Sequence, residues 1–188
     1  MSPSVLLDIL SIAEKLKCNT RHSWTSNGRQ ESVADHSWRL ALMAMLVCDE
    51  YPTLDMDKVI RMCLIHDLGE AFTGDIPAFE KKIEDEANEE VVLYRWIDSF
   101  SERYKEEFLS LLQEMKEQRT EESKLYKALD NLEAVIQHDE ADINSWLPLE
   151  YDLQFTYGSD KVKFSAYTQA LKEEIDKRTL DKINEEKK

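Results

Sequence analysis

Hydrophobic residues recur along most of this chain at the three- and four-residue spacing that is typical of amphipathic helices. A first helix is predicted over residues 4–17, and its inward stripe is Val5, Leu6, Ile9, Leu10, Ile12, Ala13 and Leu16. The same pattern predicts further helices over residues 32–51, 57–68, 88–118 with a break near 99–101, 121–140 and 160–177. The fold class that we predict is therefore all-α.

Two stretches interrupt this periodicity. Residues 18–31 contain the turn signal Asn27-Gly28 and are predicted to form a long loop. Residues 146–158 are rich in aromatic side chains and irregular, which predicts a connection or a lid. We expect a single domain over residues 1–180, with a C-terminal helical extension at 141–180 and a frayed tail at 181–188.

Composition supports this interpretation and narrows the function. The 188 residues include four Gly and four Pro, and 34% of them are charged, which favours long helices. A net charge of −15 argues against a partner that is a nucleic-acid polymer, because such proteins carry a basic face. It does not exclude a small anionic substrate, since a metal ion and a few basic residues can reverse the local charge.

The cysteines and the N-terminal residues favour a cytoplasmic location. Cys18, Cys48 and Cys63 are odd in number and lack C-x-x-C spacing, and the latter two fall in apolar helical segments. We expect reduced cysteines, with Cys48 and Cys63 in the core of a cytoplasmic protein. No signal peptide and no contact with a membrane are predicted, because neither an n-region with an apolar h-region nor a run of about 20 apolar residues is present.

The helix predicted over residues 57–68 is apolar on nearly every side, which is typical of a buried helix. It nevertheless ends in His66-Asp67, and Glu70 and Asp75 follow closely. Buried charges are costly unless they are paired or bind a metal. Because His66 and Glu70 are four residues apart, we expect both on one helical face, and we expect the chemistry of the protein here.

Two other polar residues fall on predicted core helices. Taken alone, His36 is interpreted as a hydrogen-bonded core residue, and Asp130 as a solvent-facing one beside the polar Asn131 and Glu133. If both meet His66 and Asp67, two imidazoles and two carboxylates favour one divalent ion, which could be Mn, Co, Fe, Ni, Zn or Mg. Such an ion can lower the pKa of a bound water from about 16 towards about 7.

The order of these four residues resembles a known signature. His36, then His66-Asp67 thirty residues later, then Asp130 on a later helix is similar to the H…HD…D pattern of the HD-domain metal-dependent phosphohydrolases. The resemblance covers about residues 5–140, and it implies an all-α HD-domain helical bundle. No histidine lies between Asp67 and Asp130, which favours a mononuclear metal site.

Two sequence blocks refine the resemblance. Residues 31–37 (ESVADHS) and 66–77 (HDLGEAFTGDIP) resemble the 5′-deoxynucleotidase-like branch of this family. The resemblance implies that the protein removes the phosphate from nucleoside 5′-monophosphates by metal-activated water, with Glu70 and Asp75 in catalysis. It also implies a homodimer and contact between the Arg21 region and the nucleotide.

The segment around Arg21 supplies the predicted substrate contacts. Arg21 and Arg29 are expected to clamp the phosphate, because one guanidinium can bind two phosphoryl oxygens. Trp24 is expected to stack on or enclose the sugar or base. Bacterial members of the branch have adjacent Arg and Trp, whereas here His22-Ser23 separates them, an Arg-x-x-Trp arrangement shown by the eukaryotic-like members.

Two alternatives remain at this level. One is hydrolysis of another nucleotide phosphoester, such as a triphosphate or a cyclic nucleotide. The other is a nucleotide-binding module that does not catalyse a reaction, and the presence of both Glu70 and Asp75 argues against it. Identifying the products separates these hypotheses from a monophosphatase.

Overall fold

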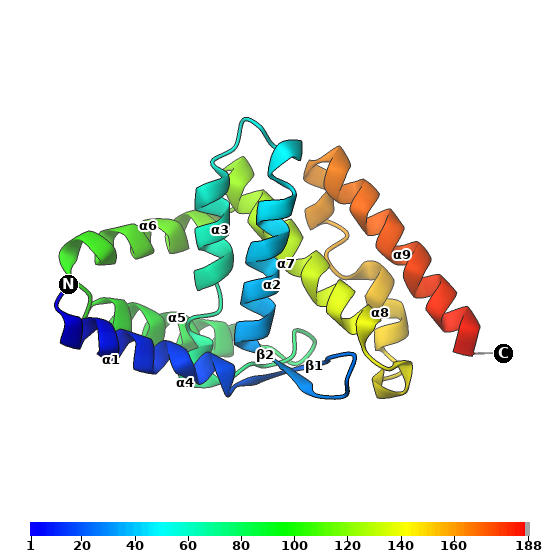
Figure 1. Cartoon of the computed structure of the whole chain (residues 1–188), viewed down its shortest axis with the longest axis horizontal. Coiled ribbons are helices and arrows are strands. Elements are labelled where there is room, and N and C mark those ends of the chain that lie inside the picture. Colours follow the sequence, from blue (N-terminus) through cyan, green and yellow to red (C-terminus); the bar gives the residue numbers. More distant parts are fainter. Residues whose placement is uncertain (187–188) are drawn as a thin grey trace.

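The computed structural model describes residues 1–186, and it confirms the all-α prediction. Helix α7 (Glu121–Glu140) lies at the centre of the bundle. It packs against α2 (Val33–Leu46), α3 (Met56–Ile65) and α9 (Ala166–Glu186), as Figure 1 shows. The main hydrophobic core is formed where α2, α3 and α7 meet, with fully buried Leu40, Val59, Met62 and Leu129.

Local capping fixes where the core helices start. Helix α2 begins with a capping box in which Asp35 N donates to Ser32 Oγ at 3.1 Å and Ser32 N donates to Asp35 Oδ2 at 2.9 Å. Helix α3 begins after Asp55, whose carboxylate accepts from Lys58 N at 3.0 Å. The capping box places His36 in the first turn of α2, at the buried end of the bundle.

The N-terminal helix lies at the edge of the molecule. Helix α1 (Pro3–Ala13) is followed by a 3₁₀ turn at Glu14–Lys17, and it has no fully buried residue. Leu6 and Leu10 are about half exposed, so the predicted inward stripe is wrong at these two positions. The stripe has too few neighbours at this edge to cover it, although Leu16 is buried as predicted.

Helices α5 (Ile83–Ile97) and α6 (Glu102–Glu117) form an antiparallel pair beside α1 (Figure 1). The break predicted near residues 99–101 is confirmed, because α5 ends at Ile97 and α6 starts at Glu102. Helix α5 starts earlier than the predicted residue 88, since Asp85 caps its first turn by accepting from Lys82 N at 3.0 Å.

The loop predicted over residues 18–31 is wrong, because the segment forms a β-hairpin. Strands β1 (Thr20–Trp24) and β2 (Gln30–Ser32) pair in antiparallel fashion, with Thr20 opposite Ser32 and Trp24 opposite Gln30. Four residue steps along β1 therefore face two along β2, which is a bulge. The bulge removes the two-residue alternation by which a strand is recognised in a sequence.

The continuous helix predicted over residues 57–68 is also wrong in detail. Helix α3 ends at Ile65, and residues 66–69 form a tighter turn in which Leu68 N bonds Ile65 O at 3.2 Å. A separate short helix, α4 (Glu70–Thr73), follows, so His66 and Glu70 do not share the face of one regular helix. Leu64 is 50% exposed, and α3 is therefore not buried on all sides.

The C-terminal part is packed onto α7. It contains a 3₁₀ turn at Ile143–Ser145, helix α8 (Glu150–Thr156), a second 3₁₀ turn at Lys161–Phe164, and α9. Trp146 is buried and stacks on His138, so the aromatic segment is a packed connection. Helix α9 continues to Glu186, which makes the predicted fraying wrong for residues 181–186; residues 187–188 lie outside the described part.

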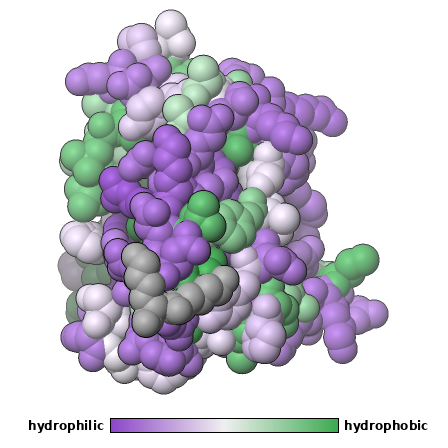
Figure 2. Space-filling model, turned by 90° about the vertical axis from the view of Figure 1, so that its right-hand side faces the viewer, coloured by the Kyte–Doolittle hydropathy of each residue, from purple (hydrophilic) through white to green (hydrophobic). Residues whose placement is uncertain are grey.

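The three cysteines are free, and Cys63 is buried as predicted. The prediction for Cys48 is wrong: α2 ends at Leu46, and Cys48 lies exposed in a short surface turn. Among the described residues, no helix combines the length and the apolar character needed to cross a membrane. Figure 2 shows that the face carrying α9 is mainly hydrophilic, with scattered hydrophobic patches.

Candidate metal centre and active site

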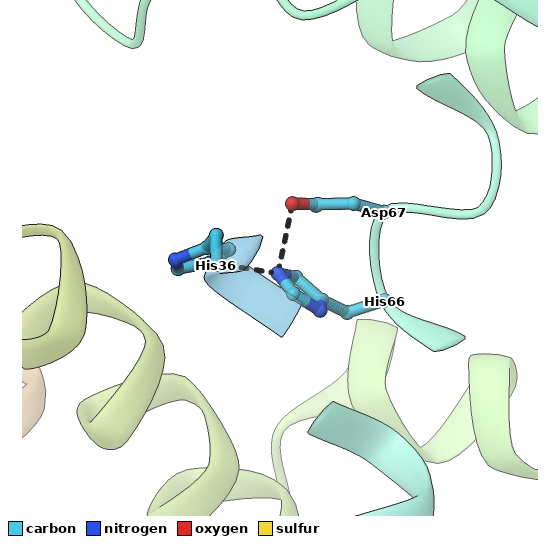
Figure 3. A group of neighbouring side chains, drawn as sticks. All are labelled: His36, His66 and Asp67. Atoms are coloured by element: carbon cyan, nitrogen blue, oxygen red, sulfur yellow. Dashed lines mark hydrogen bonds and ion pairs between the residues drawn. The ribbon is translucent and has the colours of Figure 1, made fainter. Parts of the chain in front are cut away.

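The four predicted metal ligands come together from three helices. His36 extends from the first turn of α2, His66 and Asp67 follow the end of α3, and Asp130 lies in the middle of α7. The Nε2 atoms of His36 and His66 are 3.2 Å apart. Asp130 Oδ1 lies 3.1 Å and 3.5 Å from these two nitrogens, and Asp67 Oδ2 lies 2.9 Å from His66 Nε2. Figure 3 shows how His36, His66 and Asp67 approach one another.

These separations match those of ligands around one divalent ion. Metal–ligand bonds of about 2.1 Å at right angles place neighbouring donor atoms roughly 3 Å apart. A donor set of two imidazoles and two carboxylates suits several divalent metals and leaves room for water and substrate. The residues present therefore fit a single divalent ion.

The protons on the imidazoles support this interpretation. His66 Nδ1 lies 2.9 Å from the carbonyl oxygen of Cys63, which can only accept, so this nitrogen carries the proton. His36 Nδ1 donates to the buried carboxylate of Glu133. Both Nε2 atoms are then left with lone pairs, and they face two carboxylate oxygens. Four electron-rich atoms converge, an arrangement that requires a cation or extra protons.

The pKa values show how strongly this cluster attracts positive charge. Burial alone would lower the pKa of His66, but the carboxylates of Asp67 and Asp130 raise it to about 10. Burial opposes ionisation of Asp130, and Lys127 and the two imidazoles nevertheless hold its pKa well below its usual range. Without a metal ion the cluster therefore retains protons, and a divalent ion would displace them.

Glu133 is a residue that sequence reasoning missed. It is fully buried, and Asp130 is buried as well, so the interpretation of Asp130 as a solvent-facing residue beside Asn131 and Glu133 is wrong. Its Oε1 accepts from Arg39 Nε at 2.5 Å, while Arg39 Nη1 also contacts Glu140. Burial raises its pKa, but His36 and Arg39 outweigh burial and keep Glu133 ionised. Its position three residues after Asp130, on the same helical face, is the signal that could have revealed it.

Lys127 is a second residue of α7 that sequence reasoning missed. Its Nζ lies 2.7 Å from Asp130 Oδ2, so each oxygen of this carboxylate has its own partner. Lys127 precedes Asp130 by three residues on α7, which places both side chains on one face. The lysine thus helps to orient Asp130 and adds a positive charge beside the cluster.

A polar cavity opens beside the cluster. Its lining is rich in charged side chains: Arg21, Asp67, Glu70, Asp75, Lys81, Glu86, Lys127 and Asp130, together with Ile76, Ala78 and Tyr157. Both predicted catalytic acids, Glu70 and Asp75, therefore line the same cavity as two of the predicted ligands, Asp67 and Asp130. The cavity offers both acids and cations to a small charged substrate.

The two acids have raised pKa values. Glu70 is 3% exposed, and its Oε2 has no hydrogen-bond partner among residues 1–186. Burial, followed by the nearby carboxylates of Asp67 and Asp75, raises the pKa of Glu70 to about 9. Burial also raises the pKa of Asp75, with a smaller contribution from Asp67.

Of the three predicted substrate contacts, the structure brings Arg21 to the cavity. Its Nη1 lies 3.3 Å from Asp67 Oδ2, and its Nε lies 3.3 Å from the buried carboxylate of Glu31. Arg21 lies in the bulged part of β1, between the paired Thr20 and Trp24. The Arg21 guanidinium therefore lies beside the predicted metal ligands.

Trp24 and Arg29 do not line this cavity in the described structure. Arg29 lies near the hairpin turn, is more than half exposed, and pairs with Asp35 at 2.8 Å. The Trp24 ring is 36% exposed, and its carbonyl oxygen accepts from Gln137 at 2.7 Å. Because neither residue lines the cavity, their positions do not support the predicted substrate contacts.

A second cavity adjoins the first. The two share Arg21, Asp75, Ala78 and Tyr157 in their linings. Beyond this boundary the second cavity is lined mainly by apolar and aromatic groups from β1, the segment after α4, α7 and α8. Because they share these residues, we treat the two cavities as adjoining parts of one depression between the charged cluster and α8.

Comparisons with known proteins identify the family of this chain. The sequence model of the HD domain matches residues 13–172. The 5′-deoxynucleotidase HDDC2 of Mus musculus is 34% identical over 164 residues, which cover 85% of this chain and 80% of that protein. The human 5′-deoxynucleotidase HDDC2 is 33% identical over 139 residues, covering 72% and 67%.

Solved structures show the same fold. A protein from Magnetospirillum magnetotacticum MS-1, described as a predicted metal-dependent phosphohydrolase, superimposes with a TM-score of 0.73 at 25% identity over 93% of both chains. A conserved hypothetical protein from Pyrococcus furiosus gives a TM-score of 0.63 at 27% identity, over 92% of this chain and 98% of that one. The chain therefore belongs to the HD domain family, in the branch of the 5′-deoxynucleotidase HDDC2 proteins.

Proposed function

We propose that the protein is a phosphomonoester hydrolase that removes the 5′-phosphate from deoxyribonucleoside or ribonucleoside 5′-monophosphates. One observation carries the proposal: two imidazoles and two carboxylates converge beside a cavity that also contains Arg21 and two acids with raised pKa values. The names of the HDDC2 relatives support the same activity.

His36, His66, Asp67 and Asp130 would hold one divalent ion, because their donor atoms lie close together and an ion would displace the protons that the metal-free cluster retains. When bound, this ion would neutralise phosphoryl charge, activate the attacking water and favour the ionised forms of nearby carboxyls. Glu133 and Cys63 O hold the two imidazole rings with their Nε2 atoms directed inward.

Arg21 is the residue that we assign to the phosphate. Its guanidinium lies at the cavity, it keeps its positive charge at all relevant pH values, and it can bind two phosphoryl oxygens at once. Glu31, which is 1% exposed, holds the Nε side of the guanidinium at 3.3 Å. Lys127, which also lines the cavity, adds positive charge there.

The two acids divide the proton transfers. In its ionised form Glu70 orients the attacking water and takes its proton, and its unpartnered Oε2 is the atom available for this role. We assign to Asp75 the proton that the departing O5′ of the nucleoside takes up, a role that is compatible with its raised pKa.

The test is a matrix of divalent metals against nucleoside 5′-monophosphates, with phosphate release as the readout. We expect no release from the metal-free protein in a chelator, and release of one phosphate per nucleotide with at least one metal. Equal amounts of nucleoside and phosphate identify monoester hydrolysis. Release of diphosphate, triphosphate or a linear nucleotide from other substrates, with no activity on monophosphates, would contradict the proposal.

We further propose a cytoplasmic homodimer, which needs no membrane and no nucleic-acid polymer as partner. Three free cysteines are compatible with a reducing compartment. The half-exposed Leu6, Leu7 and Leu10 of α1 offer an apolar face to a second copy. Light scattering after size exclusion measures the stoichiometry, and cell fractionation measures the location.

A further inference from the structure

The second cavity differs from the first in the kind of side chain that it presents. Its apolar lining consists of Pro77, Ala78, Phe79, Ala134, Val135 and Leu153. Arg21, at the boundary with the polar cavity, is the one Lys or Arg among the residues that line it. Glu150 is an acid in the same wall and is 5% exposed. This end of the depression therefore suits an uncharged, largely apolar group, whereas a phosphate suits the polar end.

The polar groups of the second cavity are largely used by the protein itself. Glu150 accepts from Leu147 N at 2.6 Å, and its two oxygens pair with His22 Nε2 at 2.9 Å and His138 Nε2 at 3.3 Å. Gln154 donates to Val135 O at 2.8 Å. These contacts tie β1, the end of α7 and α8 together. The cavity wall is therefore held in place before any ligand binds.

Two aromatic rings remain available at this cavity. His22 and Phe79 lie edge to face with their centroids 5.5 Å apart, and Phe79 is 38% exposed. The bulge in β1 allows Arg21 to line both cavities while the neighbouring His22 and Ser23 line the second. Figure 1 shows that the hairpin and α8 lie at the same end of α7.

We infer that the second cavity binds the base of the nucleoside, with Phe79 and His22 as its aromatic wall and Glu150 holding His22 in position. This inference rests on the proposed function, because it takes the phosphate to bind at the metal centre. Asp75 and Tyr157, which line both cavities, would then face the sugar, and Arg21 would remain at the phosphate. Helix α8, which follows α7, thereby becomes part of the substrate site.

Phe79→Leu tests the inference, because leucine keeps apolar volume and removes the aromatic ring. Tyr104→Leu is the matched control: Tyr104 is 37% exposed and lies on α6, outside both cavities. The metal-loaded full chain is assayed with dAMP and with 2-deoxyribose 5-phosphate, which has the same sugar and phosphate but no base. Thermal melting checks that each variant is folded.

We expect Phe79→Leu to lower kcat/KM for dAMP roughly tenfold, mainly through KM, because a base–aromatic stack is lost. Hydrolysis of 2-deoxyribose 5-phosphate should stay unchanged, and Tyr104→Leu should change neither substrate. An unchanged kcat/KM for dAMP, or an equal loss on both substrates, would overturn the inference and leave the proposed function standing.

Binding of nucleosides without phosphate separates the two hypotheses. Saturation-transfer NMR with 2′-deoxyadenosine and thymidine should show binding to the wild-type protein and a weaker signal with Phe79→Leu. If no monophosphate were hydrolysed but this difference remained, the proposed function would fail and the base site would stand. If neither nucleoside bound to the wild-type protein, the base site would be refuted whatever the hydrolytic activity.

Discussion

The two ends of the depression are built in different ways. At the metal centre, side chains from α2, α7 and the end of α3 surround one point, and charge decides their arrangement. At the second cavity, a bulged strand, a loop and a short helix form a mainly apolar wall. The predicted metal ligands thus lie on or beside the core helices, whereas the residues that we assign to the base lie mainly on the irregular segments around them.

The largest effect is expected from Asp67→Asn, which removes one carboxylate charge from the predicted metal centre. We expect loss of bound metal and loss of phosphate release to the detection limit, because His66 and Arg21 also lose their ionic partner. Metal content by mass spectrometry and phosphate release are the two measurements. Asp57→Asn, an exposed position on α3, is the matched control. A folded, metal-analysed Asp67→Asn variant with an undiminished rate would refute the assignment.

Glu70→Gln separates catalysis from metal binding within the same end. The amide keeps the shape of the side chain but cannot accept a proton from water. We expect metal content to be retained and kcat to fall roughly 100- to 10,000-fold. The exposed Glu84→Gln should leave kcat unchanged. A Glu70→Gln variant that loses its metal would show that Glu70 acts as a ligand.

Glu133→Gln tests how much the metal end depends on residues behind the ligands. The substitution weakens the carboxylate contact that fixes His36 Nδ1, and we expect metal affinity to fall roughly 10- to 100-fold. Isothermal titration with Mn²⁺ or Co²⁺ measures this. Glu140→Gln is the control, since Glu140 also pairs with Arg39 but is exposed and does not contact His36. Equal affinities for the two variants would mean that Glu133 has a packing role alone.

The smallest expected effect is on the stability of the metal-free protein. The pKa of Glu70 is about 9 in the fold and near 4.5 in the unfolded chain, so the folded state binds more protons between these values. The free energy of unfolding should therefore fall as pH rises through this window. Glu70→Gln should reduce this pH dependence, and Glu84→Gln should preserve it. Thermal melting in a chelator between pH 5 and 9 measures the difference, and identical slopes for Glu70→Gln and wild type would contradict the raised pKa.

The metal end could be predicted from sequence because its residues lie on regular helices. His36, His66, Asp67 and Asp130 each stand on or beside an apolar helical pattern, where a polar residue is conspicuous. The role of Glu133 behind His36 was not predicted, because the polar neighbour Asn131 made that part of α7 resemble a solvent-facing side. Helical periodicity alone does not show which polar residue a neighbouring helix will cover.

The second end could not be predicted, because its residues belong to segments without periodicity. The bulge hides β1, so Arg21 and His22 were placed in a loop, and Trp24 and Arg29 could not be told apart from them. Glu150 lies in the aromatic segment and pairs with His22, which is more than 100 residues earlier in the chain. Partners so distant in sequence become visible when the packing of α7 and α8 is known.

The irregular register of the hairpin has a further consequence for how this fold can diversify. Thr20 pairs with Ser32 and Trp24 pairs with Gln30, so the extra residues of β1 lie between two paired positions. Of the residues in that interval, Arg21 is assigned to the phosphate, whereas His22 and Ser23 line the second cavity alone. We therefore expect substitutions at His22 and Ser23 to alter which nucleotides are accepted, while the paired residues at both ends hold the start of α2 and its His36 in place.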